Sequence, residues 1–347
     1  MPIAPLPPVR SLSSKPEFEA LKAACAVRDT ASFDARTEFK EIATIPEEDL
    51  HLLGYLSSAV IEPFVYLQTI AEVSLNEKDF SALLASLPPV LNDRLAQVLN
   101  GRDCSDLGQL AATLRAESSA LLTRQEEARD IGRKNTLRYL SLPYVDVYVA
   151  TSMRAAADFV SQHRFTESVF EDRSVKNLKL RFFDPTLSYE DDRVTKGLIE
   201  CLMLQRASVT LYNAGTTDTM GKDSELAATL AQGKPVIVYV PEGTAFDRRA
   251  DTFRLDHPLG LQIDHDTGVA HGILVARTPE HCAKLLRGVL LNNLDLHILH
   301  EGGLYLLEER TTGSVVRVVT DNALITHAFW TYFRHHQDKS STVLQGL

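Results

Sequence analysis

From Pro143 onwards, short runs of apolar, β-branched and aromatic residues alternate with segments long enough to form helices. The runs contain few polar residues, which is typical of strands that are buried on both faces of a parallel sheet. Strands of this kind alternating with helices predict a doubly wound α/β domain with a parallel sheet. The four runs predicted as strands are VDVYVA (145–150), LKLRFF (178–183), SVTLY (208–212) and PVIVYV (235–240).

After Pro241 a polar, charged loop is followed by further apolar runs. We predict that they continue the sheet and end in a C-terminal appendage, so that the α/β domain spans residues 143–347. The turn residues at 311–313 (TTG) are expected to join two strands as a hairpin. The predicted elements are strands at 271–277, 304–309 and 315–320 and helices at 279–293 and 322–335.

The N-terminal part of the chain is rich in leucine and alanine and has the spacing of amphipathic helices. Residues 1–14 are proline-rich and are predicted to be an extended lead-in, and residues 15–140 an all-α domain. The acidic residues after Pro46 mark the start of a helix, and residues 107–138 indicate one or two exposed helices. No catalytic motif occurs here, so we predict a regulatory domain that docks a protein partner or trigger.

The formal net charge is −10, which offers no basic surface for nucleic acid or an anionic membrane. No apolar run approaches the ~20 residues of a membrane-spanning helix, and the first residues lack the pattern of an export signal. We therefore expect a cytoplasmic protein without a membrane or nucleic-acid partner. Its scattered cysteines are predicted to be reduced core thiols: Cys25, Cys104, Cys201 and Cys282.

Polar residues follow the first three predicted strands. Because ligands of an open parallel sheet bind beyond the carboxyl ends of its strands, these residues are candidates for a binding site. The third strand is followed by a long loop with two glycines that runs into a helix. The candidates, in chain order, are Ser152, Met153, Arg154, Asp184, Asp192, Asn213, Asp218, Ser224 and Glu225.

Some candidates also have a purely structural interpretation. Ser224 or Asp223 can cap the helix, and an acid such as Glu225 in its first turn is favoured by the helix dipole without any function. Arg154 suits a phosphate, held together with Thr151, Ser152 and the N-terminus of the next helix. It can equally pair with Asp158, four residues on.

Other chemistry receives little support from the sequence. His257, His265 and His271 lie among aspartates and could bind a metal ion, but they have no spacing fixed by a helix. Neither a Walker loop nor a GxGxxG motif after the first strand is present, which disfavours ATP hydrolysis and dinucleotide redox chemistry. A GxSxG nucleophile elbow is also absent.

Two stretches of the α/β part resemble one known family. DTMGKDSELAATLAQGKPVIVYV (218–240) is similar to the signature of the nucleoside 2-deoxyribosyltransferases, in which an Asp-rich loop precedes a Glu-containing helix and a GKPVI strand. VDVYVATSM (145–153) is similar to that family's first strand. Bacterial Toll/interleukin-receptor (TIR) domains that act as NAD glycohydrolases are distant relatives. The resemblance covers residues 146–240 and implies a Rossmann-like, nucleoside deoxyribosyltransferase-like fold.

The resemblance also implies a site that cleaves an N-glycosidic bond. Glu225 falls at the family's nucleophile, and Tyr148 falls at the tyrosine that orients it. Asp218 lies near the acid of the preceding loop, and Asp191 or Asp192 stands in for the acid that handles the base. The sequence departs from the family at residues 220–222 (MGK), where the family has small residues, and at Arg154, which has no counterpart.

A carboxylate suits this chemistry on physical grounds. Cleavage builds positive charge at the anomeric carbon, which a carboxylate can stabilise or attack. The leaving base needs a proton or hydrogen bonds from a second acid, for which Asp184, Asp192 and Asp218 are candidates. Water or an acceptor base then completes hydrolysis or transfer. A phosphate bound by Arg154 would favour NAD or a nucleotide over a bare nucleoside.

We therefore predict an N-glycosidase for NAD or a related nucleotide, with no cofactor. Two other interpretations stay open, a nucleotide-sensing module without turnover and a nucleoside 2-deoxyribosyltransferase of salvage. A helical domain fused to such a domain resembles bacterial immune effectors of antiviral defence, in which the partner domain keeps the glycosidase silent until it is triggered. We expect a homo-oligomer, since the relatives complete their pockets across subunit interfaces.

Overall fold

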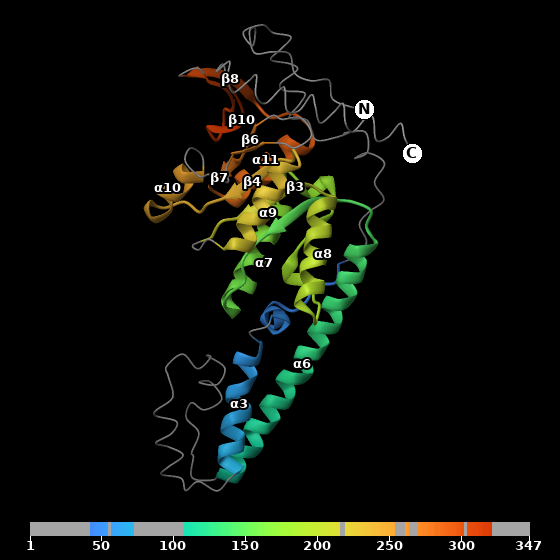
Figure 1. Ribbon diagram of the computed structural model, residues 1–347. Coiled ribbons are helices and arrows are strands. Elements are labelled where there is room, and N and C mark those ends of the chain that lie inside the picture. Colours follow the sequence, from blue (N-terminus) through green and yellow to red (C-terminus); the bar gives the residue numbers. More distant parts are fainter. Residues whose placement is uncertain are drawn as a thin grey trace.

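The computed structural model of the chain describes residues 42–54, 57–72, 107–215, 219–253, 261–263, 270–301 and 304–320. In this part, helices of the N-terminal half lead into a parallel sheet, which an antiparallel sheet follows (Figure 1). No helix in the described ranges is long and apolar enough to cross a membrane.

The parallel sheet confirms the predicted α/β architecture. Its strands lie in the order β2-β1-β3-β4-β7, so the chain winds away in opposite directions from β1, toward β2 on one side and β3 on the other. The second strand is shorter than predicted, because a 3-10 helix (η2, Lys176–Leu178) and the left-handed Lys179 occupy its first half. The strands are β1 (Val145–Ala150), β2 (Phe182–Phe183), β3 (Ala207–Asn213), β4 (Val236–Tyr239) and β7 (Leu274–Ala276).

Helices cover both faces of this sheet, as the buried strands require. Val147 and Val149 of β1 pack on the face covered by α7 and α11, whereas Tyr148 and Ala150 pack on the face covered by α8 and α9. Cys282 of α11 is a buried thiol as predicted, but Cys201 of α8 is exposed. Cys25 and Cys104 lie outside the described residues. The helices are α7 (Ala156–Phe170), α8 (Arg193–Arg206), α9 (Met220–Ala231), α10 (Thr244–Asp251) and α11 (Pro279–Leu290).

The C-terminal part continues the parallel sheet by one strand, β7, and its other described strands form a second, antiparallel sheet. The run 271–277 is divided at Ile273, so that its first half pairs in a second sheet and only β7 joins the parallel one. The predicted hairpin at 311–313 is confirmed, with Gly313 at φ +64. The predicted helix at 322–335 lies outside the described residues. The antiparallel sheet has the order β5 (Leu261–Ile263), β6 (Ala270–Gly272), β10 (Ser314–Thr320), β9 (Leu304–Glu309) and β8 (Leu296–Glu301).

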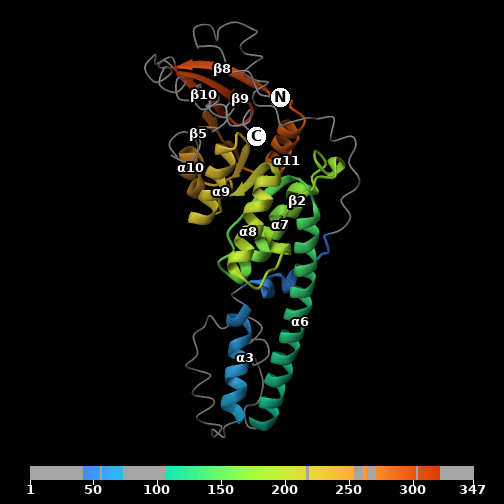
Figure 2. The same ribbon diagram turned by 45° about the vertical axis from the view of Figure 1, so that its right-hand side comes forward.

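The described N-terminal elements are helical. A 3-10 helix, η1 (Glu47–Leu53), begins after Pro46 and ends at Gly54, and α3 (Ser57–Glu72) is a separate helix rather than its continuation. The predicted segment 107–138 forms one long helix, α6 (Leu107–Ser141). Figures 1 and 2 both show α3 beside the N-terminal half of α6, whose other half runs along the α/β unit. The lead-in at 1–14 lies outside the described residues.

Candidate functional site

A tyrosine and a glutamate meet at the point where the winding of the sheet reverses. The hydroxyl of Tyr148 on β1 donates a hydrogen bond of 2.7 Å to Oε1 of Glu225 on α9, the helix that follows β3. Tyr148 is 1% exposed, and its ring stacks on Phe183 at a centroid distance of 5.4 Å. These contacts fix the position of the donor, so one oxygen of Glu225 is oriented by the sheet.

Glu225 lies one turn deeper in its helix than predicted. The helix begins at Met220, because the hydroxyl of Thr219 accepts the N–H of Lys222 as an N-cap. Asp223 is therefore the acid of the first turn, and Glu225 belongs to the second. Ser224 is not a cap, since its exposed hydroxyl donates to the carbonyl of Gly221 at 2.7 Å.

The environment of Glu225 favours its neutral form. Burial raises the pKa of Glu225 from 4.5 to about 7. The hydrogen bond from Tyr148 and the charge of Lys222 oppose this rise in pKa, whereas the charge of Glu200 adds to it. Burial also raises the pKa of Tyr148 well above its ordinary value, so this residue is a neutral donor at physiological pH. A carboxyl with a pKa of about 7 can act in either protonation state.

Glu200 of α8 is a second carboxyl at this site, which the sequence analysis missed. It is half-buried, and burial raises its pKa, against the opposing charge of Lys196, whose Nζ lies 3.9 Å away. Its charge acts on both Tyr148 and Glu225. The available signal was helical spacing, because Glu200 lies beside Ile199 and three residues before Met203, both of which are buried.

Three residues predicted to bind a ligand instead form hydrogen bonds with neighbouring residues of the protein. Asp184 is 1% exposed, and its Oδ1 accepts the N–H and the hydroxyl of Thr186 at 2.8 and 2.7 Å. Its Oδ2 lies 3.5 Å from Nδ1 of His163, and this contact raises the pKa of His163. Asp192 is the N-cap of α8, and Asn213 bonds to Gln162 and Gly215. No hydrogen bond joins these three to Glu225 in the described part of the chain.

Backbone hydrogen bonds hold the end of the first strand. The carboxylate of Asp158 accepts the N–H groups of Arg154 and Ala155 at 2.6 and 2.7 Å, so it already occupies the N-terminus of α7. Arg154 thus contacts Asp158 through its backbone and not through the guanidinium. The side chain of Met153 packs against an apolar cluster, Ser152 is half-buried, and Oγ1 of Thr151 is buried with no partner among the described residues.

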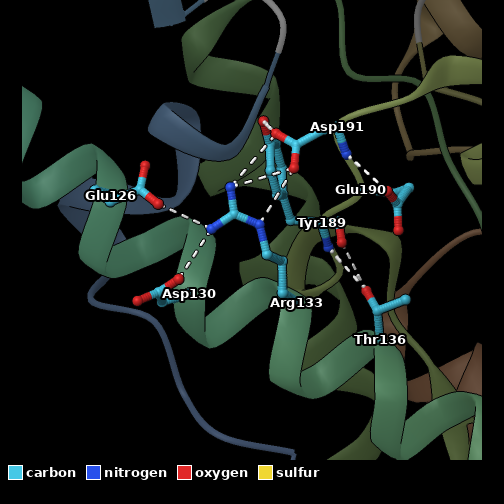
Figure 3. A network of polar contacts seen from close by, with 7 residues as sticks. All are labelled: Glu126, Asp130, Arg133, Thr136, Tyr189, Glu190 and Asp191. Atoms are coloured by element: carbon cyan, nitrogen blue, oxygen red, sulfur yellow. Dashed lines mark hydrogen bonds and ion pairs between the residues drawn. The ribbon is translucent and has the colours of Figure 1, made fainter.

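Asp191 belongs to a network that connects the loop before α8 to α6 (Figure 3). Its carboxylate accepts bonds from the hydroxyl of Tyr189 at 2.8 Å and from the guanidinium of Arg133 at 3.3 Å. These contacts lower the pKa of Asp191, with the Tyr189 bond as the largest cause. The backbone N–H and carbonyl of Tyr189 bond to the hydroxyl of Thr136 on α6. Asp191 is therefore an anchor of this loop.

Two predictions fall outside the described residues. Asp218 lies in the undescribed segment 216–218, between β3 and α9. His257 and His265 are likewise undescribed, and so is the side chain of His271. The described residues contain no cluster of His, Cys, Asp and Glu that could hold a metal ion. The alternative of a metal site at these histidines thus lies outside the described residues.

Comparison with known proteins adds no functional assignment. No family model matches the sequence, and no curated protein matches it. The crystal structure of a conserved protein from Enterococcus faecalis V583 is similar over 44% of this chain and 99% of its own, at 14% identity and a TM-score of 0.27. A likeness at this level carries no argument about fold or function, so the function is inferred from the site.

Proposed function

We propose that the α/β part is an N-glycosidase that cleaves NAD or a related nucleotide with Glu225 as its nucleophile. The observation that carries this proposal is the 2.7 Å hydrogen bond from Tyr148 to Glu225 at the reversal point of the sheet. Ligands of such sheets bind at this point, beyond the carboxyl ends of the strands. The sequence resemblance at residues 146–240 supports the same pair of residues and a nucleoside deoxyribosyltransferase-like fold.

The proposed reaction has two steps. An oxygen of ionised Glu225 bonds to the anomeric carbon of the ribose while the bond from that carbon to the base nitrogen breaks, and the electron pair goes to the nitrogen. For NAD, this pair neutralises the positive ring, so nicotinamide leaves as a neutral molecule. Water then attacks the same carbon, which frees Glu225 and releases ADP-ribose and a proton. The Tyr148 bond holds one oxygen of Glu225 and leaves the other for the attack.

Analysis of released products tests the proposal directly. Purified protein is incubated with NAD and with a panel of nucleosides and nucleotides, and the products are separated by chromatography. We expect nicotinamide and ADP-ribose from NAD. Transfer of a deoxyribose to an added base would instead identify a salvage transferase. Binding without any released base would identify a nucleotide sensor, and either result would overturn the proposal.

Replacement of Glu200 is expected to affect purine and nicotinamide leaving groups differently. A purine has to be protonated as it leaves, which requires an acid, whereas nicotinamide does not. We expect Glu200→Gln to reduce cleavage of purine nucleotides by about 100-fold and cleavage of NAD by less than about fivefold. Since the charge of Glu200 raises the pKa of Glu225, the acidic limb of the NAD rate profile is also expected to move to lower pH. Rate profiles for both substrates measure these effects, with Glu280→Gln, an exposed acid on α11, as a control.

We also propose that the N-terminal helices regulate the site, as in a defence-type effector whose activity waits for a trigger. Support comes from the network of Figure 3, because it connects α6 to the loop that leads into α8 and thus to Glu200. The proposal includes a homo-oligomer, in which a second copy of the chain is the partner. Comparing NAD cleavage by the dilute and the concentrated protein tests whether assembly is the trigger.

A further inference from the structure

Lys222 is a buried lysine in the first turn of α9. It is 3% exposed, and its Nζ donates to the carbonyls of Asn213 and Ala214 at 3.1 and 2.8 Å. The ammonium group also lies 5.3 Å from the ring centroid of Tyr212. The side chain therefore connects the beginning of α9 to the carboxyl end of β3, where the proposed site begins.

This placement is unfavourable for a lysine without a further role. The N-terminal turn of a helix carries partial positive charge, which disfavours a cation, and burial of an ammonium group requires compensation. Small residues occupy this region in the family that the sequence resembles. The two carbonyls supply the compensation here. The guanidinium of Arg249 on α10 also donates to the carbonyl of Ala214, at 3.2 Å, so two cations share this acceptor.

Lys222 and Glu225 are three residues apart, so they lie on one side of α9. The described titratable groups that act on Glu225 come from three elements: Tyr148 from β1, Glu200 from α8 and Lys222 from α9 itself. Glu200 and Lys222 have opposite effects on the charge of Glu225. Lys222 is the cation of this set, and its position is fixed by the end of β3.

We propose that Lys222 is a positioning residue of the reaction, which anchors the first turn of α9 to the end of β3 and places a positive charge on the side of the helix that carries Glu225. The inference rests on the proposed function and deepens it. Glu200 favours the neutral form of Glu225, and the charge of Lys222 opposes this effect.

Removal of this charge should change the pH dependence of the site. Lys222 lowers the pKa of Glu225, so in Lys222→Met that pKa should rise above its value of about 7. We expect this rise in pKa to lower the rate of NAD cleavage several-fold at pH 6, where less of Glu225 is then ionised. At pH 9 the rate should return to within about threefold of wild type, because Glu225 is then ionised in both proteins. A purely structural defect would reduce the rate at every pH.

The titration of Glu225 tests the inference without relying on activity. Carbon-13 NMR of glutamate-labelled protein follows the Glu225 carboxyl, identified by its absence from Glu225→Gln. A higher midpoint in Lys222→Met, with wild-type midpoints in Lys222→Arg and in the exposed control Lys284→Met, would support the inference. An unchanged midpoint in Lys222→Met would overturn it.

A second variant protects the test against a folding failure. Lys222→Gln keeps a donor for the carbonyls but removes the charge, and it should raise the midpoint in the same way. If the midpoint moves but no nucleotide is cleaved by wild type, the proposed function fails while the electrostatic coupling stands. If NAD is cleaved and the rate loss does not depend on pH, the role assigned to Lys222 fails alone.

Discussion

Glu225→Gln is expected to abolish NAD cleavage and at the same time to stabilise the fold. Glutamine has nearly the same shape and can still accept the bond from Tyr148, but it cannot form the ester with the ribose. Loss of a covalent nucleophile lowers turnover by on the order of 10³-fold or more. The assay is the release of nicotinamide at pH 7.5, followed over hours to detect residual turnover.

The gain in stability follows from the raised pKa of Glu225. Between pH 4.5 and about 7 the native state binds more protons at this residue than the unfolded state, so its contribution to stability falls as pH rises. Glutamine removes this penalty. We therefore expect Glu225→Gln to be more stable than wild type by between about 1 and 3 kcal/mol above pH 7, and equal to it near pH 4.

Urea unfolding at pH 4 and pH 7.5 measures this difference. Glu280→Gln is the matched control, because Glu280 is an exposed acid on α11, against the opposite face of the sheet. It should retain wild-type activity and show no gain in stability at pH 7.5. A Glu225→Gln protein that still releases nicotinamide would rule out the proposed nucleophile. One that is less stable at pH 7.5 would contradict the electrostatic account.

Periodicity was enough to predict the parallel sheet, because its strands are buried on both faces and their sequences are almost continuously apolar. It failed at 271–277, where one apolar run supplies strands to two sheets. Nothing in the apolar pattern marks the division at Ile273, which is decided by pairing with distant strands. The helical character of residues 107–138 was predictable, but the sequence did not show that they form one helix and not two, nor that η1 and α3 are separate.

Only some residues of the candidate site could be predicted from the sequence. Tyr148 and Glu225 are 77 residues apart, and only the resemblance brought them together before the structure did. Acids that precede helices are ambiguous, because capping and catalysis favour the same residue types; Asp192 is such a cap. Glu200 was missed because an acid within a helix is usually solvated, and its partial burial depends on the packing of α8 against the sheet.

The α6 helix is attached to the α/β unit by the buried side-chain amide of Asn135. Asn135 is fully buried, and its side chain accepts the N–H of Ala43 at 2.8 Å and donates to the carbonyls of Ala43 and Leu187 at 2.9 and 3.0 Å. One side chain thus joins α6, the segment before η1 and the loop that leads to α8. Gly132, one turn earlier, leaves room for Tyr189, whose Cβ would lie 2.6 Å from an added Cβ.

Asn135→Ala is expected to lower the free energy of unfolding by about 2–4 kcal/mol, because three backbone groups, that of Leu187 buried and those of Ala43 partly buried, lose their partner. Lys134→Ala, an exposed neighbour on the same helix, should change it by less than about 0.5 kcal/mol. Urea unfolding of both variants measures this contrast. Since the loop at 184–192 leads into α8 and Glu200, NAD cleavage by the folded Asn135→Ala protein should also change, whereas cleavage by Lys134→Ala should not. Equal loss of stability in both variants would mean that the Asn135 hydrogen bonds contribute nothing beyond packing. A destabilised Asn135→Ala protein with unchanged turnover would mean that α6 does not act on the site through this loop, and it would contradict the regulatory role proposed for the N-terminal helices.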